Sequence, residues 1–192
     1  MVRHDLVHSA STLLLGGALG VSTTWLVLAG VVPLSTDVPS AGRIALEVAA
    51  YVLCFDAYFY GLHRLLHTRA LYCRVHAVHH RATQPTVATA LAFHPLEALA
   101  ILGFVPMALC LVPIHVVSLA LVCAFLSTSI LLAHAAHDPF PDGWQRLRVL
   151  GWYVTPREHH VHHARRDCNY SATFSLFDRA FGTLHAGDAA AD

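Results

Sequence analysis

Long uncharged stretches alternate with short polar ones along this chain. Four segments are apolar enough to be read as membrane helices, at about 11–34, 44–60, 98–112 and 116–133. The first carries no charge and is long enough to cross the hydrocarbon core at 1.5 Å per residue. The last two are shorter and are separated only by a turn around Pro113. The pattern predicts four transmembrane helices arranged as two hairpins.

Composition agrees with a membrane protein. Of the 192 residues, 56% are hydrophobic and 12% are charged, and the mean hydropathy is +0.53. A soluble domain has about one quarter charged residues. A bundle of this length leaves little chain for a second unit, so we expect residues 1–192 to form a single all-α membrane domain. The first segment exceeds the apolar core of a signal peptide, and Arg3 is the only arginine before it, which favours a span.

The arginines predict which side each loop occupies. All 12 basic residues are arginine, and four spans would place all of them except Arg43 on one side, with the loop 61–90 and the tail 134–185. Arginine-rich loops stay in the cytosol, so we expect this side to be cytosolic. The 12 acidic residues balance the charge, which argues against a nucleic-acid partner. Many Ala, Arg and Val residues without any Lys favour a bacterial inner membrane.

Histidine is the unusual component, with 16 residues. Three motifs, HRLLH, HAVHH and HHVHH, place histidines three and four positions apart, so each set shares one face of a helix and all three sets can aim at a common point. His160 directly follows His159 and is turned about 100° away from it. The spacing predicts metal binding by His63, His67, His76, His79, His80, His159, His162 and His163.

Eight imidazoles exceed the coordination shell of one ion and indicate two metals. Imidazole suits Zn, Cu, Fe and Ni alike. A substrate dissolved in lipid offers mainly unactivated C–H bonds, whose attack requires a metal that activates O2, and this context favours two irons over zinc. The five cysteines occur singly without a CxxC pair, which excludes a zinc ribbon or a redox dithiol.

The motifs HRLLH, HAVHH, FHPLEAL, VTPREHHVHH and NYSATFSLFDRAFGT occur in the order seen in the fatty acid hydroxylase/sterol desaturase superfamily of integral-membrane di-iron oxygenases. The resemblance covers residues 56–183. It implies a four-helix membrane base under a cytosolic histidine-rich helical cap, built here from 61–90 and 134–185, and ligand roles for the eight histidines. It adds His134, which stands ahead of Pro139 and Pro141 as a single histidine does in the sterol-desaturase-like branch.

Other polar residues are candidates for ligands or for groups that orient ligands. Asp56 precedes His63 by two helical turns and is expected to accept its second N–H, with pairing to an arginine as the alternative. Glu97 is expected to cap a helix or form a salt bridge. We expect His4, His8, His115 and His185 to be ordinary surface residues. The remaining candidates are His94, His137, His160, Asp138, Asn169 and Asp178.

Two segments depart from the pattern of the superfamily. His137 is a weaker ligand candidate than His134, because Asp138 and Pro139 occupy the positions where some members have a second histidine. The Asn169–Tyr170 pair matches, but Ser171 stands where glycine is usual and Phe177 where Trp is usual. These changes affect the expected shape of the substrate channel more than metal binding.

These features predict an O2-dependent hydroxylase or desaturase of a fatty acyl, sterol, hopanoid or carotenoid lipid. The chain has no GxGxxG loop, no CxxCH haem motif and no iron–sulfur cysteine set, so electrons must come from a separate ferredoxin or cytochrome b5-like protein. The cytosolic arginines suit such an acidic donor, and they suit anionic lipid headgroups equally well. The alternatives are a membrane zinc hydrolase and a non-catalytic metal-binding protein.

Overall fold

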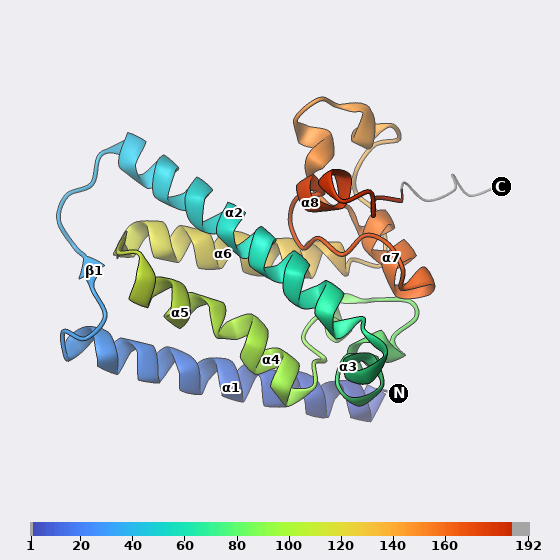
Figure 1. The fold of residues 1–192 in the computed structure, drawn as a ribbon, viewed down its shortest axis with the longest axis horizontal. Helices are drawn as coiled ribbons and strands as arrows, with labels where there is room; N and C mark the ends of the chain where they lie inside the picture. The colour runs from blue at the N-terminus through green and yellow to red at the C-terminus, as the bar shows by residue number, and fades with distance from the viewer. Residues whose placement is uncertain (1, 186–192) are drawn as a thin grey trace.

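The computed structural model describes residues 2–185 and is largely helical (Figure 1). Five helices form a bundle, two of them end to end, and the shorter elements gather at one end of it. The five are α1 (Val2–Leu28), α2 (Ala41–Leu66), α4 (Pro95–Leu102), α5 (Phe104–Leu111) and α6 (Val116–Ala133). Two short strands, β1 (Leu34–Ser35) and β2 (Ile114–His115), pair in parallel at the opposite end.

Three helices, α1, α2 and α6, are long and apolar enough to cross a membrane. The remaining apolar segment is broken into α4 and α5 at Gly103, where a Cβ would lie 2.6 Å from the carbonyl oxygen of Leu99. The expectation of four complete spans in two hairpins therefore remains a prediction. The bounds of α6 agree with the expected 116–133, but α1 begins near the N-terminus and ends before Gly30, whose φ is +72°.

The bundle is apolar both inside and outside. Helix α1 packs against α4, and α2 packs against α6, around a core that includes Phe55, Phe104 and Val122. On the outer face of α1, Leu14, Val21 and Trp25 are 75%, 73% and 67% exposed. So much exposed apolar surface suits lipid rather than water, and it marks an integral membrane protein.

Residues 67–93 and 134–185, called the cap below, cover one end of the bundle, where the N-terminus also lies (Figure 1). The His8 side chain contacts the carbonyl of Phe93, which ties α1 to the cap. The cap contains α3 (Arg69–Arg74), η1 (His76–Arg81), η2 (Val87–Thr89), η3 (Trp144–Arg146), η4 (Leu150–Trp152), α7 (Pro156–Arg165) and α8 (Leu176–Ala180).

His115, expected at the surface, is instead 3% exposed at the far end of the bundle. Its Nδ1 accepts from the backbone N–H of Val117 at 3.1 Å and so caps α6. Its Nε2 lies 2.7 Å from the carbonyl oxygen of Asp37. The sequence gives no signal for this role, because the residues that commonly cap a helix N-terminus are Ser, Thr, Asp, Asn and Gly rather than histidine.

Candidate metal centre

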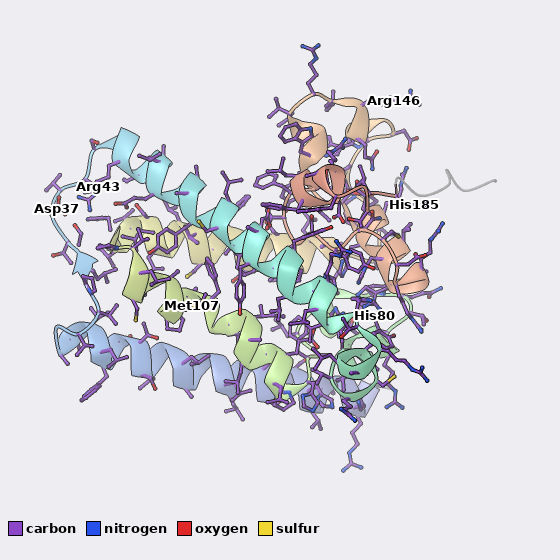
Figure 2. The ribbon with its side chains drawn as sticks, in the orientation of Figure 1. Asp37, Arg43, His80, Met107, Arg146 and His185 are labelled. Carbon is purple, nitrogen blue, oxygen red and sulfur yellow. The ribbon has the colours of Figure 1, made fainter. Side chains whose placement is uncertain are left out.

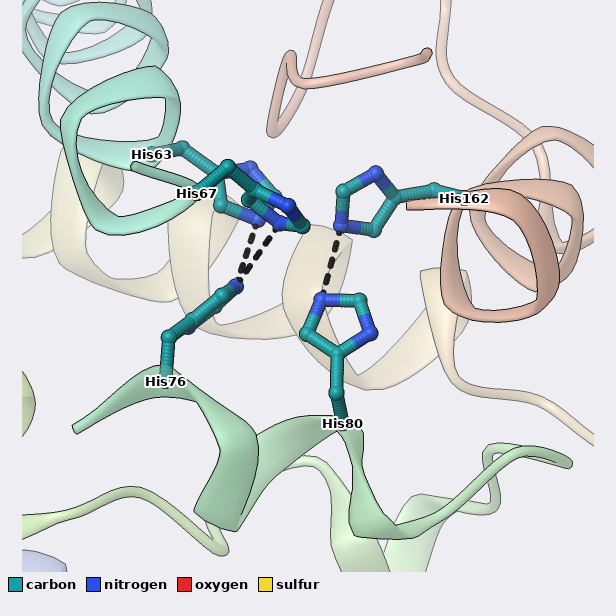
Figure 3. Close-up of side chains that lie close together, drawn as sticks. All are labelled: His63, His67, His76, His80 and His162. Atoms are coloured by element: carbon teal, nitrogen blue, oxygen red, sulfur yellow. Dashed lines mark hydrogen bonds between the residues drawn. The ribbon is translucent and has the colours of Figure 1, made fainter. Parts of the chain in front are cut away.

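Nine histidines converge in two groups under the cap. In the five-histidine cluster, nitrogens of His63, His67, His76, His80 and His162 all lie within 4.8 Å of one another, and α2, η1 and α7 contribute them from three directions (Figure 3). In the four-histidine cluster, the same limit holds for His79, His134, His159 and His163. The structure thus brings together every histidine that the sequence predicted as a ligand.

The local sequence explains how α7 presents its histidines. Thr155 and Glu158 form a capping box, in which Glu158 Oε2 accepts from the Thr155 backbone N–H at 2.9 Å. Pro156 occupies the first turn, so the helix begins at a defined residue. Positions 159, 162 and 163 then face the interior, and all three side chains are buried.

The three motifs do not aim at a single common point, because their histidines divide between two clusters. His76 and His80 belong to the five-histidine cluster, whereas His79 belongs to the other. The same division occurs in α7, where His162 joins the first cluster and His159 and His163 join the second. Helix η1 is a 3-10 helix rather than an α-helix. Both elements lie between the clusters, so one turn of each supplies both.

Backbone carbonyls determine which nitrogen of several rings carries the hydrogen. Nδ1 of His63 donates to the carbonyl of Tyr170 at 2.7 Å, and Nδ1 of His162 donates to that of Cys168 at 2.7 Å. In the other cluster, His134 and His163 donate to backbone carbonyls at 2.8 and 2.9 Å. A carbonyl oxygen only accepts, so in these four neutral rings Nε2 is left with a lone pair.

These lone pairs oppose one another. Nε2 of His134 and Nε2 of His163 each lie 3.1 Å from Nε2 of His159, which can donate a hydrogen to only one of them. At least one of these contacts therefore has no hydrogen between its two nitrogens. In the five-histidine cluster, Nε2 of His63 lies 3.1 Å from Nε2 of His76. A cation placed among the nitrogens removes this repulsion, so the residues present fit a metal in each cluster.

Glu97 holds one of the rings from behind. It is 1% exposed, and its Oε1 accepts a hydrogen bond from Nδ1 of His76 at 2.7 Å. A carboxylate in this position fixes the ring and makes its other nitrogen more basic toward a metal. The sequence suggested a helix cap or a salt-bridge partner for Glu97, without naming the partner. The pairing was missed because His76 lies 21 residues away in the chain.

Burial keeps the histidines outside the membrane helices neutral. Desolvation lowers the pKa of His67 and of His134 to about 4 and that of His162 to about 3. The pKa of His79 and of His159 is also lowered, first by burial and then by neighbouring imidazoles. Neutral imidazole is the form that binds metal, so the cap presents its ligands ready for metal near pH 7.

Several candidates lie outside both clusters. Nδ1 of His94 accepts from the backbone N–H of Leu96 at 3.2 Å and caps α4. His137 is exposed and His160 is half-buried, and neither is a member of either cluster. Asp138 accepts from the backbone N–H of Phe140 at 2.9 Å and holds the turn after α6.

Asp56 does not orient His63 as expected. Its carboxylate is fully buried and accepts from the backbone N–H groups of Thr173 and Phe174 at 3.0 and 2.9 Å. Asp178 acts in the same way on Tyr170 and Ser171, with both distances at 2.8 Å. The two carboxylates therefore hold the chain around 170–174, which includes the carbonyl that receives the His63 hydrogen.

Asn169 joins two parts of the cap. Its backbone is left-handed, with φ of +55°, which asparagine tolerates better than most residues. Its Nδ2 donates to the carbonyl of Glu158 at 3.0 Å, so it links the loop to α7. Within residues 2–185, Asn169, Asp56 and Asp178 make no hydrogen bond to a clustered histidine, so these three residues position the site rather than join it.

A small cavity lies between the clusters and the membrane helices. Its volume is about 30 Å³, and histidines of both clusters border it, among them His63 and His134. Apolar side chains of Phe59, Phe93 and Ile130 form part of its lining.

These features define an integral membrane protein with two histidine clusters, each able to hold a metal ion, at one end of its helices. A family model described as fatty acid hydroxylase matches residues 48–183, which is more than half of the chain. The protein belongs to the fatty acid hydroxylase family, as the motifs predicted.

The chain is similar to several named proteins. It is 34% identical to methylsterol monooxygenase 1 of Rattus norvegicus over 129 residues, which cover 67% of this chain and 43% of the relative. It is 33% identical to methylsterol monooxygenase 2-2 of Arabidopsis thaliana, in a match that covers 78% of this chain and 56% of the relative. It is also 33% identical to a very-long-chain aldehyde decarbonylase of Oryza sativa, in a match that covers 76% of this chain and 25% of the relative. The match thus spans about half or less of each relative's length. No solved structure matches the chain.

Proposed function

We propose that this protein is an O2-dependent di-iron hydroxylase or desaturase of a membrane lipid. The observation that carries the proposal is the convergence of nine imidazoles into two clusters of opposed lone pairs. When bound, two irons would supply the activation of O2 that attack on an unactivated C–H bond requires. His63, His67, His76, His80 and His162 would hold one iron, and His79, His134, His159 and His163 the other.

The protein's own residues would decide what reaches the metals. Phe59 and Ile130 give the cavity an apolar wall, against which a hydrocarbon group would pack beside the imidazoles. The relatives include methylsterol monooxygenases, which supports a sterol-like lipid as substrate, and an aldehyde decarbonylase, which supports a fatty chain. Both substrates present apolar groups from the bilayer to the same cavity.

Electrons would enter through the outer surface of the cap. His67 is the only clustered histidine that is not buried. Arg64 and Arg166 lie beside it, stacked over the rings of Tyr170 and Tyr72 at 5.9 and 5.6 Å. Neither arginine forms an ion pair within residues 2–185. This surface suits an acidic ferredoxin or cytochrome b5-like donor.

The predicted topology completes the proposal. The whole chain 1–192 would form one membrane domain, with α4 and α5 together as a broken fourth span of a thinned bilayer. The arginine distribution supports a cytosolic cap, and the composition supports a bacterial inner membrane.

Metal content tests the proposal most directly. Elemental analysis of protein purified in detergent should find about two irons per chain, and His79→Ala and His162→Ala should each lose iron. Incubation with lipid extracts, O2 and a reductant should then yield hydroxylated or desaturated lipid. Zinc with turnover in the absence of O2 would instead indicate a hydrolase, and the lack of stoichiometric metal would contradict any catalytic role.

A further inference from the structure

A second apolar surface lies outside the helical bundle, on residues 144–152, which we call the side segment. Val149, Leu150 and Leu147 are 75%, 60% and 45% exposed, and Trp152 is 41% exposed. The sequence WQRLRVLGW contains two exposed arginines and no acidic residue. Connecting loops that face water are usually polar, so this surface requires an explanation.

The side segment is an ordered unit rather than a loose connection. Helices η3 and η4 pack closely at Gly151, where a Cβ would lie 2.6 Å from the carbonyl oxygen of Trp144. The carbonyl of Trp152 accepts from the backbone N–H of Ser175 at 2.7 Å, next to α8. The apolar side chains are therefore presented by a fixed backbone.

Its attachment lies at the membrane end of the cap. Tyr153 bridges to Phe174, and the ring of Phe174 lies 6.3 Å from that of Phe125 on α6. The backbone N–H of Phe174 donates to Asp56 on α2. The side segment thus begins where two apolar, membrane-length helices enter the cap.

From this point the side segment projects sideways from the bundle. Figure 1 shows it above α8, away from α3 at the outer end of the cap. Arg146 lies near its outer edge (Figure 2). In a bilayer that surrounds α2 and α6, a sideways projection at this level meets the lipid headgroups rather than bulk water.

We propose that the side segment lies in the membrane interface and binds the lipid surface. Leu147, Val149 and Leu150 would enter the acyl region, and Trp152 has the amphipathic ring that favours the headgroup level. Arg146 and Arg148 form no ion pair among the residues described, and lipid phosphates complement their charge. Phe174, which bridges to Tyr153 next to the side segment, also lines an apolar groove with Leu53 of α2 and Phe125 of α6, so one lipid layer would cover both.

Tryptophan fluorescence provides the test. The chain has three tryptophans, and Trp25→Phe with Trp144→Phe leaves Trp152 as the single reporter. In nanodiscs whose lipids carry bromine on the acyl chains, Trp152 should lose at least about half of its emission, whereas acrylamide in the water should quench it weakly. These replacements are conservative, so the measurement does not depend on a disruptive variant.

Charged replacements sharpen the test. Val149→Asp with Leu150→Asp should restore most of the Trp152 emission while leaving the metal content unchanged, because neither residue contacts the histidine clusters. Val87→Asp is the matched control, since Val87 is 52% exposed in η2, and it should leave the quenching unchanged. Two results would overturn the proposal: strong quenching by acrylamide alone, or protection from both quenchers in discs that hold two copies of the chain.

Discussion

His162 and His163 are neighbours in the chain, yet their imidazoles belong to different histidine clusters. Nε2 of His162 lies 3.0 Å from Nε2 of His80, whereas Nε2 of His163 lies 3.1 Å from Nε2 of His159. Each ring is held by a different carbonyl, that of Cys168 for His162 and that of Ala82 for His163. Helix α7 therefore lies between the two clusters, and one of its turns supplies ligand candidates to both.

This division predicts separate metal losses. His162→Ala should remove the metal of the five-histidine cluster and His163→Ala that of the four-histidine cluster, so each should lower the iron content from about two to about one per chain. The adjacent substitutions serve as controls for each other, because both shorten one buried side chain of the same helix. Elemental analysis checks the result, and complete loss of iron in both variants would show that the clusters bind as one unit.

Glu97 should set the affinity of the five-histidine cluster for its metal. Glu97→Ala removes the acceptor of the His76 Nδ1 hydrogen, and we expect metal affinity to fall by about 10–100-fold. Glu97→Gln keeps an oxygen acceptor, so its metal affinity should fall much less. Competition with a chelator during metal release measures both, and equal losses in the two variants would contradict a role through His76.

Asp56 should contribute to stability rather than to metal binding. Asp56→Ala leaves the backbone N–H groups of Thr173 and Phe174 without their buried acceptor, and each unsatisfied group costs about 1–3 kcal/mol. Thermal unfolding in detergent should therefore occur at a lower temperature, with Asp56→Asn intermediate because its amide retains one oxygen. If iron content fell while the unfolding temperature stayed unchanged, Asp56 would have a direct role at the metals.

Acid should destabilise the metal-free protein. The pKa values of His67 and His134 are lowered by burial to about 4, from an ordinary value of about 6.5 in the unfolded chain. Between these values the unfolded chain binds more protons than the folded one, so the free energy of unfolding falls as the pH drops from about 6.5 toward 4. Above pH 6.5 both groups are neutral in the folded and the unfolded chain, so they should not change the free energy of unfolding. Unfolding temperatures of the metal-free protein between pH 8 and 5 test the sign, and greater stability at pH 5 would contradict it.

The arginines beside His67 should govern reduction by an acidic electron donor. Arg64→Glu together with Arg166→Glu should slow reduction by about tenfold at low salt and weaken its dependence on salt. Arg43 lies at the opposite end of the bundle (Figure 2), so Arg43→Gln is the control and should leave the rate unchanged. Stopped-flow reduction with a ferredoxin measures the rates, and similar slowing by the control would argue against docking near His67.

The sequence was sufficient to predict the class of protein and the histidines that gather at one end of its helices. Apolar runs that exceed a dozen residues force helices in a membrane, because lipid cannot satisfy exposed backbone groups. Histidines at positions three and four apart share a helical face for a purely geometric reason. The members of both clusters were therefore identifiable, although for His134 this required the family resemblance in addition to its spacing.

Only the tertiary structure decided how the histidines are divided between the two clusters. The division of His79 from His76, and of His162 from His163, depends on where η1 and α7 pass between the clusters, which local periodicity does not encode. The groups that orient the rings are mostly backbone carbonyls, such as that of Tyr170, and every residue type has one. Asp56 contacts residues more than 100 positions away. Local sequence determines helices and faces, whereas long-range packing determines which faces meet.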